Sequence, residues 1–306
     1  MEFFVSALQS GTYERADTYD SYMDKQVRLL RRCVEKDKPY LAAYSEMMTG
    51  AYFCGVRDDT YFENAEDMDG RTVTRFKELS KELDVHICFS VFEKAREFGR
   101  MAYYNSLVLV SPTRGIIGKY RKNHIPWMEN EVTKCYEKHY FKPGGGFPAY
   151  KLDNGATVGM LLCYDRSFPE SWRMYGLQNT EIICMSACTW GYRGKLFLLE
   201  LSIRAAETGA YVIATNRAGK EKVAGETQER HHFGQSGILD PEGETLASLE
   251  DEPWSFVTAK VDPALTYTAH GTLRVRDRRP ELYGLLTATG APLGAPPYRP
   301  GVDEFL

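Results

Sequence analysis

The chain has 306 residues, of which 43% are hydrophobic and 26% charged, and its formal net charge is −4. Such a chain can bury a sizeable core, and its mild negative charge is spread along the sequence, which argues against a nucleic-acid-binding surface. No apolar run approaches the length of a membrane span, so we expect a cytoplasmic protein with neither nucleic acid nor a membrane as partner.

Strand and helix patterns alternate along the chain. Apolar runs predict strands, and apolar residues at helical spacing predict helices. The hairpin-like pair 85–92 and 103–110 indicates antiparallel pairing, so we expect an α/β protein with mixed sheets. In chain order we predict strands at 3–9, 40–45, 85–92, 103–110, 157–162, 181–187, 210–215, 235–240 and 255–261, and helices at 17–36, 71–83, near 169–177 and near 195–208.

No Pro/Ser-rich linker or low-complexity stretch divides the chain. We therefore expect one domain over residues 1–280 and a C-terminal extension over 281–306 that packs on a partner subunit. Seven cysteines without paired spacings argue against a disulfide framework and fit a reducing cytoplasm. Neither Cys184 and Cys188 nor the pair His231-His232 has the companion ligands of a metal site, so we expect no metal and no cofactor.

Three chemically capable residues follow predicted strands. Glu46 ends the apolar strand 40–45, Lys122 lies in the basic segment 118–126, read as a loop, and Cys163 closes the strand 157–162. Because open α/β sheets gather active residues at the carboxyl ends of their strands, these three side chains are expected to converge. A cysteine at such a strand-to-helix turn is favoured as a thiolate, although many buried cysteines only fill space.

These segments resemble the nitrilase superfamily of carbon–nitrogen hydrolases, whose catalytic set is a Glu, a Lys and a Cys in that chain order. The resemblance implies an α-β-β-α sandwich and a subunit that assembles as a homodimer or higher homo-oligomer. It covers nearly the whole chain and lies in residues 44–46, 120–126, 163–170, 215–219, 234–243 and 278–283.

The resemblance also implies roles for the three residues. Cys163 would attack the carbonyl or ureido carbon, and Glu46 would carry protons from the thiol to the departing ammonia. Lys122 would stabilise the oxyanion together with the backbone N–H of Tyr164. The alternative for Lys122 is an ordinary solvated lysine in a basic loop.

Within the superfamily, the middle of the chain looks most like the N-carbamoyl-amino-acid amidohydrolases, through residues 137–144 and 147–150. Glu137 then takes the place of that branch's second glutamate near the site, although neighbouring lysines would also suit a surface charge cluster. The chain departs from the branch at three points. Arg166 is followed by Ser167 rather than a second arginine, Cys135 replaces a histidine, and the loop 187–193 differs.

Five further residues are candidates for substrate binding. Arg166 is the natural clamp for a substrate carboxylate, with a structural pair to Glu170 or Asp165 as its alternative. His124 is expected to be a hydrogen-bonded histidine close to the site. Trp190 and Tyr192, the aromatic residues of the loop 187–193, are expected to form pocket walls, with ordinary packing as the alternative. The candidates are Tyr164, Arg166, Trp190, Tyr192 and His124.

The expected reaction is therefore metal-independent hydrolysis of a linear, non-peptide C–N bond through a covalent cysteine intermediate. The favoured substrate is a small N-carbamoyl amino acid or related ureido compound, which would release ammonia and CO2. An amidase acting on a primary carboxamide is the alternative, and a nitrilase ranks third. From a different class, a catalytically silent binding or assembly module remains open, since folds outlive their activities.

Overall fold

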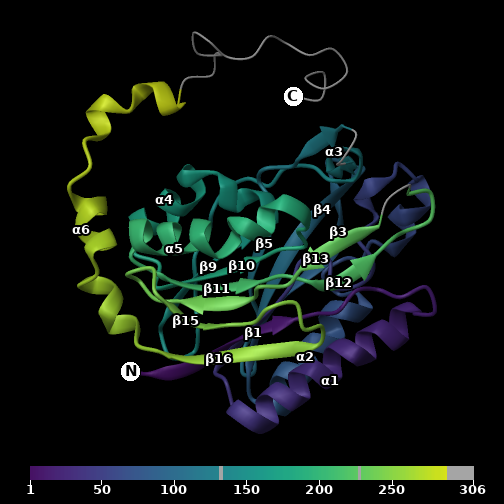
Figure 1. Cartoon of the computed structure of the whole chain (residues 1–306), viewed down its shortest axis with the longest axis horizontal. Coiled ribbons are helices and arrows are strands. Elements are labelled where there is room, and N and C mark those ends of the chain that lie inside the picture. Colours follow the sequence, from purple (N-terminus) through teal and green to yellow (C-terminus); the bar gives the residue numbers. More distant parts are fainter. Residues whose placement is uncertain (131–133, 227–228, 288–306) are drawn as a thin grey trace.

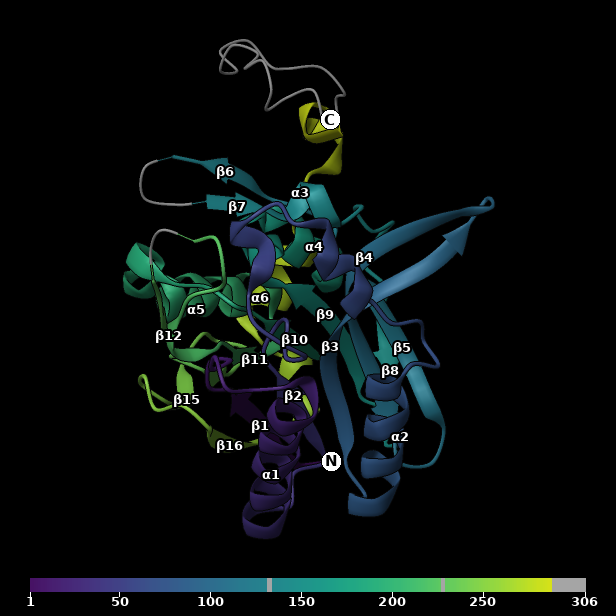
Figure 2. The same cartoon turned by 90° about the vertical axis from the view of Figure 1, so that its right-hand side faces the viewer.

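Two six-stranded sheets pack face to face, and helices cover the outer face of each sheet (Figures 1 and 2). The computed structural model describes residues 1–130, 134–226 and 229–287. The first sheet has the strand order β16-β1-β2-β3-β4-β5, and the second has the order β15-β14-β11-β10-β9-β8. This four-layer arrangement confirms the predicted α-β-β-α sandwich with mixed sheets.

In the first sheet, β1, β2 and β3 are parallel, whereas β16, β4 and β5 pair antiparallel to their neighbours. Helices α1 and α2 cover its outer face (Figure 1). The bounds are β1 Phe3–Gln9, β2 Leu41–Tyr44, β3 His86–Glu97, β4 Arg100–Ser111, β5 Gly115–Arg121, β16 Ser255–Val261, α1 Tyr19–Asp37 and α2 Arg71–Leu83.

In the second sheet, β9, β10 and β11 are parallel, and the outer strands β8, β14 and β15 are antiparallel. Helices α4 and α5 lie on its outer face (Figure 2). The bounds are β8 Tyr150–Lys151, β9 Thr157–Leu162, β10 Ile182–Ser186, β11 Tyr211–Thr215, β14 Gly237–Leu239, β15 Thr245–Ser248, α4 Pro169–Leu177 and α5 Phe197–Thr208.

The strand periodicity explains how the layers are held together. On β2, Leu41 and Ala43 pack into the core between the sheets, whereas Ala42 and Tyr44 pack against the helices of the first layer. On α2, the buried residues follow helical spacing, so one stripe faces the sheet. That helix ends at Asp84, which adopts a left-handed conformation and donates its N–H to the Ser80 carbonyl.

Each predicted strand and helix is present with ends that differ by a few residues, and α2 has the predicted bounds. One assignment was wrong. The basic segment 118–126 is not a loop throughout, because residues 118–121 belong to β5 and only the remainder leaves the sheet. Two small hairpins and a short helix were not predicted: β6 Trp127–Glu129 with β7 Lys134–Tyr136, β12 Ala218–Glu221 with β13 Arg230–Phe233, and α3 Glu137–Tyr140.

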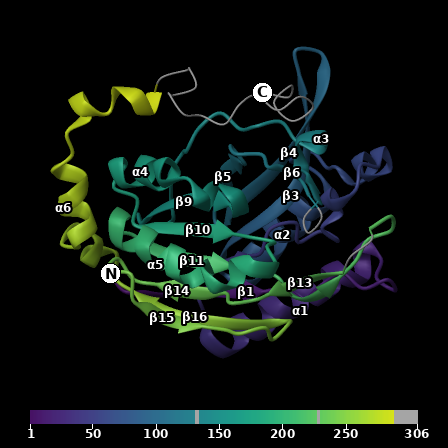
Figure 3. The ribbon, with the colours of Figure 1, turned by 45° about the horizontal axis from the view of Figure 1, so that its top comes forward.

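The last described segment runs along the edge of the molecule beside α4 and α5 (Figure 3). It contains α6, His270–Arg276, and exposes Leu273, Leu282 and Leu285. The predicted extension 281–306 lies mostly outside the described residues, and its packing on a partner subunit stays a prediction that light scattering on the whole chain would test. None of the helices in the described part of the chain combines the length and apolar character that a bilayer crossing requires.

Candidate active site

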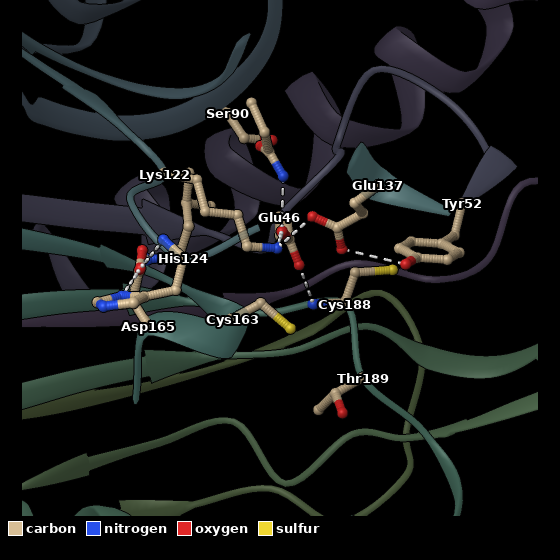
Figure 4. Close-up of polar contacts among 12 residues, drawn as sticks. Glu46, Tyr52, Ser90, Lys122, His124, Glu137, Cys163, Asp165, Cys188 and Thr189 are labelled. Carbon is tan, nitrogen blue, oxygen red and sulfur yellow. Dashed lines mark hydrogen bonds and ion pairs between the residues drawn. The ribbon is translucent and has the colours of Figure 1, made fainter. Parts of the chain in front are cut away.

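The three predicted residues converge from three strands. Glu46 lies two residues beyond β2, Lys122 directly follows β5, and Cys163 directly follows β9. A fourth side chain joins them, because Glu137 opens the short helix α3 beside the same strand ends (Figure 4). Lys122 therefore reaches the site from the end of β5, and not from a loop after β4 as its sequence context indicated.

Glu46 is fully buried and fixed by three donors. Its Oε1 accepts hydrogen bonds from Asn105 Nδ2 at 2.7 Å and from Lys122 Nζ at 3.0 Å. Its Oε2 accepts one from the backbone N–H of Cys188 at 3.0 Å. A carboxylate held in this way has one orientation, so a proton that it accepts is taken up at a defined place.

Lys122 is also fully buried and lies between two carboxylates. Its Nζ is 3.0 Å from Glu46 Oε1 and 2.6 Å from Glu137 Oε2. Burial alone would lower the pKa of this ammonium, but the charges of Glu137 and Glu46 raise it well above the ordinary value of 10.5. The lysine is therefore a permanent cation in the site.

Glu137 is buried beside Lys122, a cation that it shares with Glu46. Burial raises its pKa to about 7, although Lys122 lowers it, because one ammonium cannot neutralise two carboxylates. The second oxygen, Oε1, accepts a hydrogen bond of 3.1 Å from the hydroxyl of Tyr52, which also lies 3.1 Å from the sulfur of Cys135. Glu137 thus belongs to the site and not to a surface charge cluster.

Cys163 has an unusual backbone. Its φ is +44°, in the left-handed region that side chains other than glycine seldom adopt, where the chain turns from β9 into a 3-10 turn over Cys163–Ser167. Of the seven cysteines, six are buried and only Cys163 is partly exposed. The turn thus presents its thiol at the strand end, on the side of Glu46 and Lys122 (Figure 4).

The expectation that this position favours a thiolate was wrong. Burial raises the pKa of the Cys163 thiol to about 12, with a further increase from the Glu46 charge and opposite contributions from Lys122 and Arg166. The N-terminus of α4 lies six residues further on, too far for its dipole to dominate. The raised pKa favours the neutral form of this thiol, which requires a base to become a thiolate.

Asp165 links the cysteine turn to the lysine segment. Its Oδ2 accepts from Tyr120 Oη at 2.7 Å and from the Leu162 N–H at 3.2 Å. Its Oδ1 accepts from the His124 N–H at 2.9 Å and lies 2.7 Å from His124 Nδ1. His124 stacks on Phe168 with ring centroids 3.7 Å apart, so it is the hydrogen-bonded structural histidine that was expected.

Arg166 pairs with neither of the residues considered for it. The residue is 3% exposed, its Nη1 donates to the Cys163 carbonyl at 2.7 Å, and its Nε lies 3.3 Å from Glu200 Oε2. The ionic partner is therefore Glu200 on α5, and not Glu170 or Asp165. A guanidinium used in this way supports the cysteine turn, and a direct grip on a substrate carboxylate stays an untested prediction.

A cavity of ≈580 Å³ is lined in part by Tyr136, the residue that precedes Glu137 in the chain. Trp190 lines it and packs against Tyr52 with ring centroids 4.9 Å apart. Tyr192 does not belong to this wall, which corrects its expected position. The chain turns at Gly191, whose φ is +71°, and the Tyr192 side chain is 73% exposed.

Tyr164, whose backbone N–H was expected to help hold an oxyanion, follows Cys163 in the turn, and its ring packs edge-on against Phe168. Three residues with clear contacts in the site were missed by sequence reasoning: Tyr52, Asn105 and Asp165. Asn105 carried a local signal as an amide inside an apolar strand, and Asp165 stood within the motif 163–170, whereas Tyr52 carried no such signal. Among residues 1–130, 134–226 and 229–287, no three His, Cys, Asp or Glu side chains are grouped so as to hold a metal ion.

A thiol, a fixed carboxylate and a buried cation in one site suit addition to a carbonyl or ureido carbon. The carbon–nitrogen hydrolase family model matches residues 16–270. An N-carbamoylputrescine amidase from Oryza sativa subsp. japonica is 33% identical over 294 residues, covering 92% of this chain and 93% of that protein. A citrullinase from Francisella tularensis subsp. tularensis is 29% identical over 248 residues, covering 78% and 83%.

Solved structures share the fold. The crystal structure of a carbon–nitrogen hydrolase from Helicobacter pylori G27 superposes with a TM-score of 0.85 at 25% identity, covering 94% of this chain and 99% of that one. An amidase from Nesterenkonia sp. AN1 has a TM-score of 0.73 at 19% identity, covering 92% and 98%.

Proposed function

The chain belongs to the carbon–nitrogen hydrolase family of the nitrilase superfamily, and from this premise we propose that it hydrolyses a small ureido compound through a covalent intermediate on Cys163. The observation that carries the proposal is the buried set Glu46, Lys122 and Glu137 beside Cys163, the one cysteine residue of the chain that is not fully buried. The names of the relatives, N-carbamoylputrescine amidase and citrullinase, support a ureido substrate.

In the first half-reaction the thiol adds to the ureido carbon. Glu46 takes the proton of Cys163 while the sulfur–carbon bond forms, because the neutral thiol is a weak nucleophile. The oxygen of the tetrahedral intermediate becomes negative beside the Lys122 ammonium and the Tyr164 backbone N–H. The intermediate then collapses, the carbon–nitrogen bond breaks, and ammonia departs with the proton from Glu46.

In the second half-reaction water adds to the carbamoyl-thiol intermediate. Glu46 removes a proton from the water, and the Cys163 sulfur leaves and is reprotonated. The product is a carbamic acid, which loses CO2 to give the free amine. The sum is one ureido group and one water converted to amine, ammonia and CO2.

A primary carboxamide is the second candidate substrate, because the same atoms can perform amide hydrolysis. The observation that favours it is that Arg166 is buried and contacts the Cys163 carbonyl and Glu200, so the one arginine considered as a carboxylate clamp already has protein partners. The two candidates differ in their products. An amide releases ammonia alone, whereas a ureido compound releases ammonia and CO2 together.

The proposal is tested by following ammonia and CO2 from N-carbamoyl amino acids, β-ureido acids, N-carbamoylputrescine, citrulline and primary amides. We expect equimolar ammonia and CO2 from at least one ureido compound, with kcat/KM above that of every amide. Release of ammonia only from amides would replace the proposal with the amidase function.

Tyr52 provides a pH-dependent test of the role proposed for Glu137. Its hydroxyl donates to the Glu137 carboxylate and lowers the pKa of that group, so Tyr52→Phe raises a pKa that burial already brings to about 7. If the ionised Glu137 holds Lys122 in place, the acidic limb of the kcat/KM profile moves to higher pH by about one unit.

The matched control for Tyr52→Phe is Tyr104→Phe. It removes a tyrosine–glutamate hydrogen bond of 2.6 Å, from Tyr104 to Glu97, at the far end of the β3–β4 hairpin. We expect the control to leave the profile in place. An unmoved acidic limb in Tyr52→Phe would mean that this hydroxyl has only a packing role.

A further inference from the structure

The small hairpin of β12 and β13 belongs to neither six-stranded sheet, and its side chains reach the segment that joins two residues of the site. This segment, residues 47–51, connects Glu46 to Tyr52 and contains neither helix nor strand. It starts with Met47 in a left-handed conformation, with a φ of +54°. Because the segment has no hydrogen-bond ladder of its own, its conformation depends on partners from elsewhere in the chain. We call it the linking segment.

Arg217 provides partners for the carbonyls of the linking segment. Its side chain is fully buried, and its Nη2 donates to the carbonyls of Met47 and Gly50, each at 2.8 Å. Its Nη1 donates to Glu221 Oε1, on β12, at 2.5 Å. The rigid fork of a guanidinium fixes the directions of these bonds, which a single ammonium group does not.

Glu221 holds the end of the linking segment. Its Oε2 accepts a hydrogen bond from the Tyr52 N–H at 2.8 Å, and its Oε1 accepts one from the Tyr13 N–H at 2.9 Å. Burial alone would raise the pKa of Glu221, but the charge of Arg217 lowers it below the ordinary value of 4.5. The bond to Tyr52 is therefore charge-assisted. From β13, Arg230 Nη1 donates to the Tyr52 carbonyl at 3.2 Å.

The position of Tyr52 decides whether its hydroxyl reaches Glu137. That contact is 3.1 Å, already long for an O–H donor, so about 0.5 Å of further separation would remove most of it. Stability alone gives no reason for a buried pair such as Arg217 and Glu221, because apolar residues of similar volume are often as stable. Their polar contacts instead lead to the segment between two residues of the site.

We propose that Arg217 and Glu221 are positioning residues of the hydrolase, which fix the linking segment so that the Tyr52 hydroxyl meets the carboxylate of Glu137. Neither residue touches the reacting atoms. The inference rests on the proposed function for the role of Glu137 in the reaction, whereas the contact that it explains can be measured without turnover. The hairpin of β12 and β13 is then a support for the site.

Arg217→Lys tests the proposal, because it keeps a positive charge beside Glu221 and removes the planar fork. We expect Tyr52 to shift and Glu137 to lose a donor, so the pKa of Glu137, raised to about 7 by burial, rises further by about one unit. Infrared titration of the whole protein measures this through the band of the protonated carboxyl, assigned by its absence in Glu137→Gln. The acidic limb of kcat/KM should move in the same direction.

Two further variants make the test specific. In the double variant Arg217→Lys with Tyr52→Phe, the pKa of Glu137 should be no higher than in Tyr52→Phe alone, because both changes remove the same hydrogen bond. The matched control is Arg114→Lys. Arg114 joins the Asp153 carboxylate to the Lys151 carbonyl, each at 2.6 Å, in the turn before β5 and thus at the far end of that strand from the site. It should leave both the pKa and the profile unchanged.

The outcomes separate this inference from the proposed function. An unchanged pKa of Glu137 in Arg217→Lys, or a shift that adds in full to that of Tyr52→Phe, overturns the inference. So does an active enzyme in which the pKa moves and the kcat/KM limb does not. If Arg217→Lys fails to fold, Glu221→Asp withdraws the carboxylate from the Tyr52 N–H at constant charge and should shift the pKa in the same direction. If no compound is hydrolysed, the proposed function fails, and the infrared titration still decides whether the pair sets the Tyr52 contact.

Discussion

Replacement of Cys163 by alanine is expected to lower kcat for ammonia release by about 10⁴-fold or more, as loss of a covalent nucleophile does in other hydrolases. The fold should survive, because the sulfur holds no strand: its contact is with Arg166 Nη1, 3.5 Å away in the same turn. Release of ammonia is measured with the best substrate of the screen, and thermal unfolding checks that the variant is folded.

The matched control is Cys188→Ala. Cys188 holds Glu46 through its backbone N–H at 3.0 Å, so removing its sulfur leaves that contact in place. We expect less than about a 10-fold loss of kcat, in line with a small change in packing. If Cys188→Ala abolished activity and Cys163→Ala retained it, the assignment of the nucleophile would be wrong.

Intact-protein mass spectrometry gives an independent measure of the same assignment. During turnover of a ureido substrate, a carbamoyl adduct should appear on the parent protein and map to the peptide that contains Cys163. The pKa of this thiol, raised to about 12 by burial and by Glu46, implies that the adduct forms only where a base assists. Cys163→Ala should show no adduct on any of the six remaining cysteines.

The strands, helices and mixed α/β class followed from local signals in the sequence, whereas the α-β-β-α sandwich was implied by the resemblance to the nitrilase superfamily. The helix α2 shows an apolar stripe at helical spacing, and β9 is a continuous apolar run that ends at the cysteine. The segment 118–126 was misread because its charges concealed a strand. Lys119 and Arg121 are neutralised by Glu93, 2.8 Å and 2.6 Å away, a residue of β3 that is distant in sequence.

The site was predictable only in part, because some of its contacts join residues that are distant in the sequence. Glu46, Lys122 and Cys163 could be found because each stands at a strand end within a recognisable motif. The groups that hold them, Tyr52 and Asn105, lie in segments without such a motif, and their roles depend on contacts across more than fifty residues. The direction of the pKa shift of the cysteine also escaped prediction, because its burial and the nearby Glu46 charge depend on tertiary contacts.

Replacement of Lys122 by methionine is expected to lower both the free energy of unfolding and kcat, each for a different physical reason. The change leaves Glu46 and Glu137 buried without their shared cation, and breaking a buried ion pair typically lowers the free energy of unfolding by about 3–5 kcal/mol. Loss of one oxyanion donor lowers kcat by about 10²–10³-fold. Urea denaturation and ammonia release measure the two effects.

The stability loss should depend on pH in a defined direction. The folded-state pKa of Glu137, raised to about 7 by burial even with Lys122 present, rises further without the lysine, whereas the unfolded value stays near 4.5. A carboxyl whose folded pKa is raised binds its proton more tightly in the folded state, so stability falls as pH increases from about 4.5 through the folded pKa. The deficit of Lys122→Met should therefore be smaller at pH 5 than at pH 8.

The double variant Lys122→Met with Glu137→Gln separates structure from chemistry. It removes one carboxylate together with the cation, so much of the lost unfolding free energy should return and its dependence on pH should weaken. Turnover should stay low, because no ammonium is left to face the developing oxyanion. If the double variant regained activity together with stability, Lys122 would act only as the counter-ion of two buried acids, and the oxyanion role would pass to backbone N–H groups such as that of Tyr164.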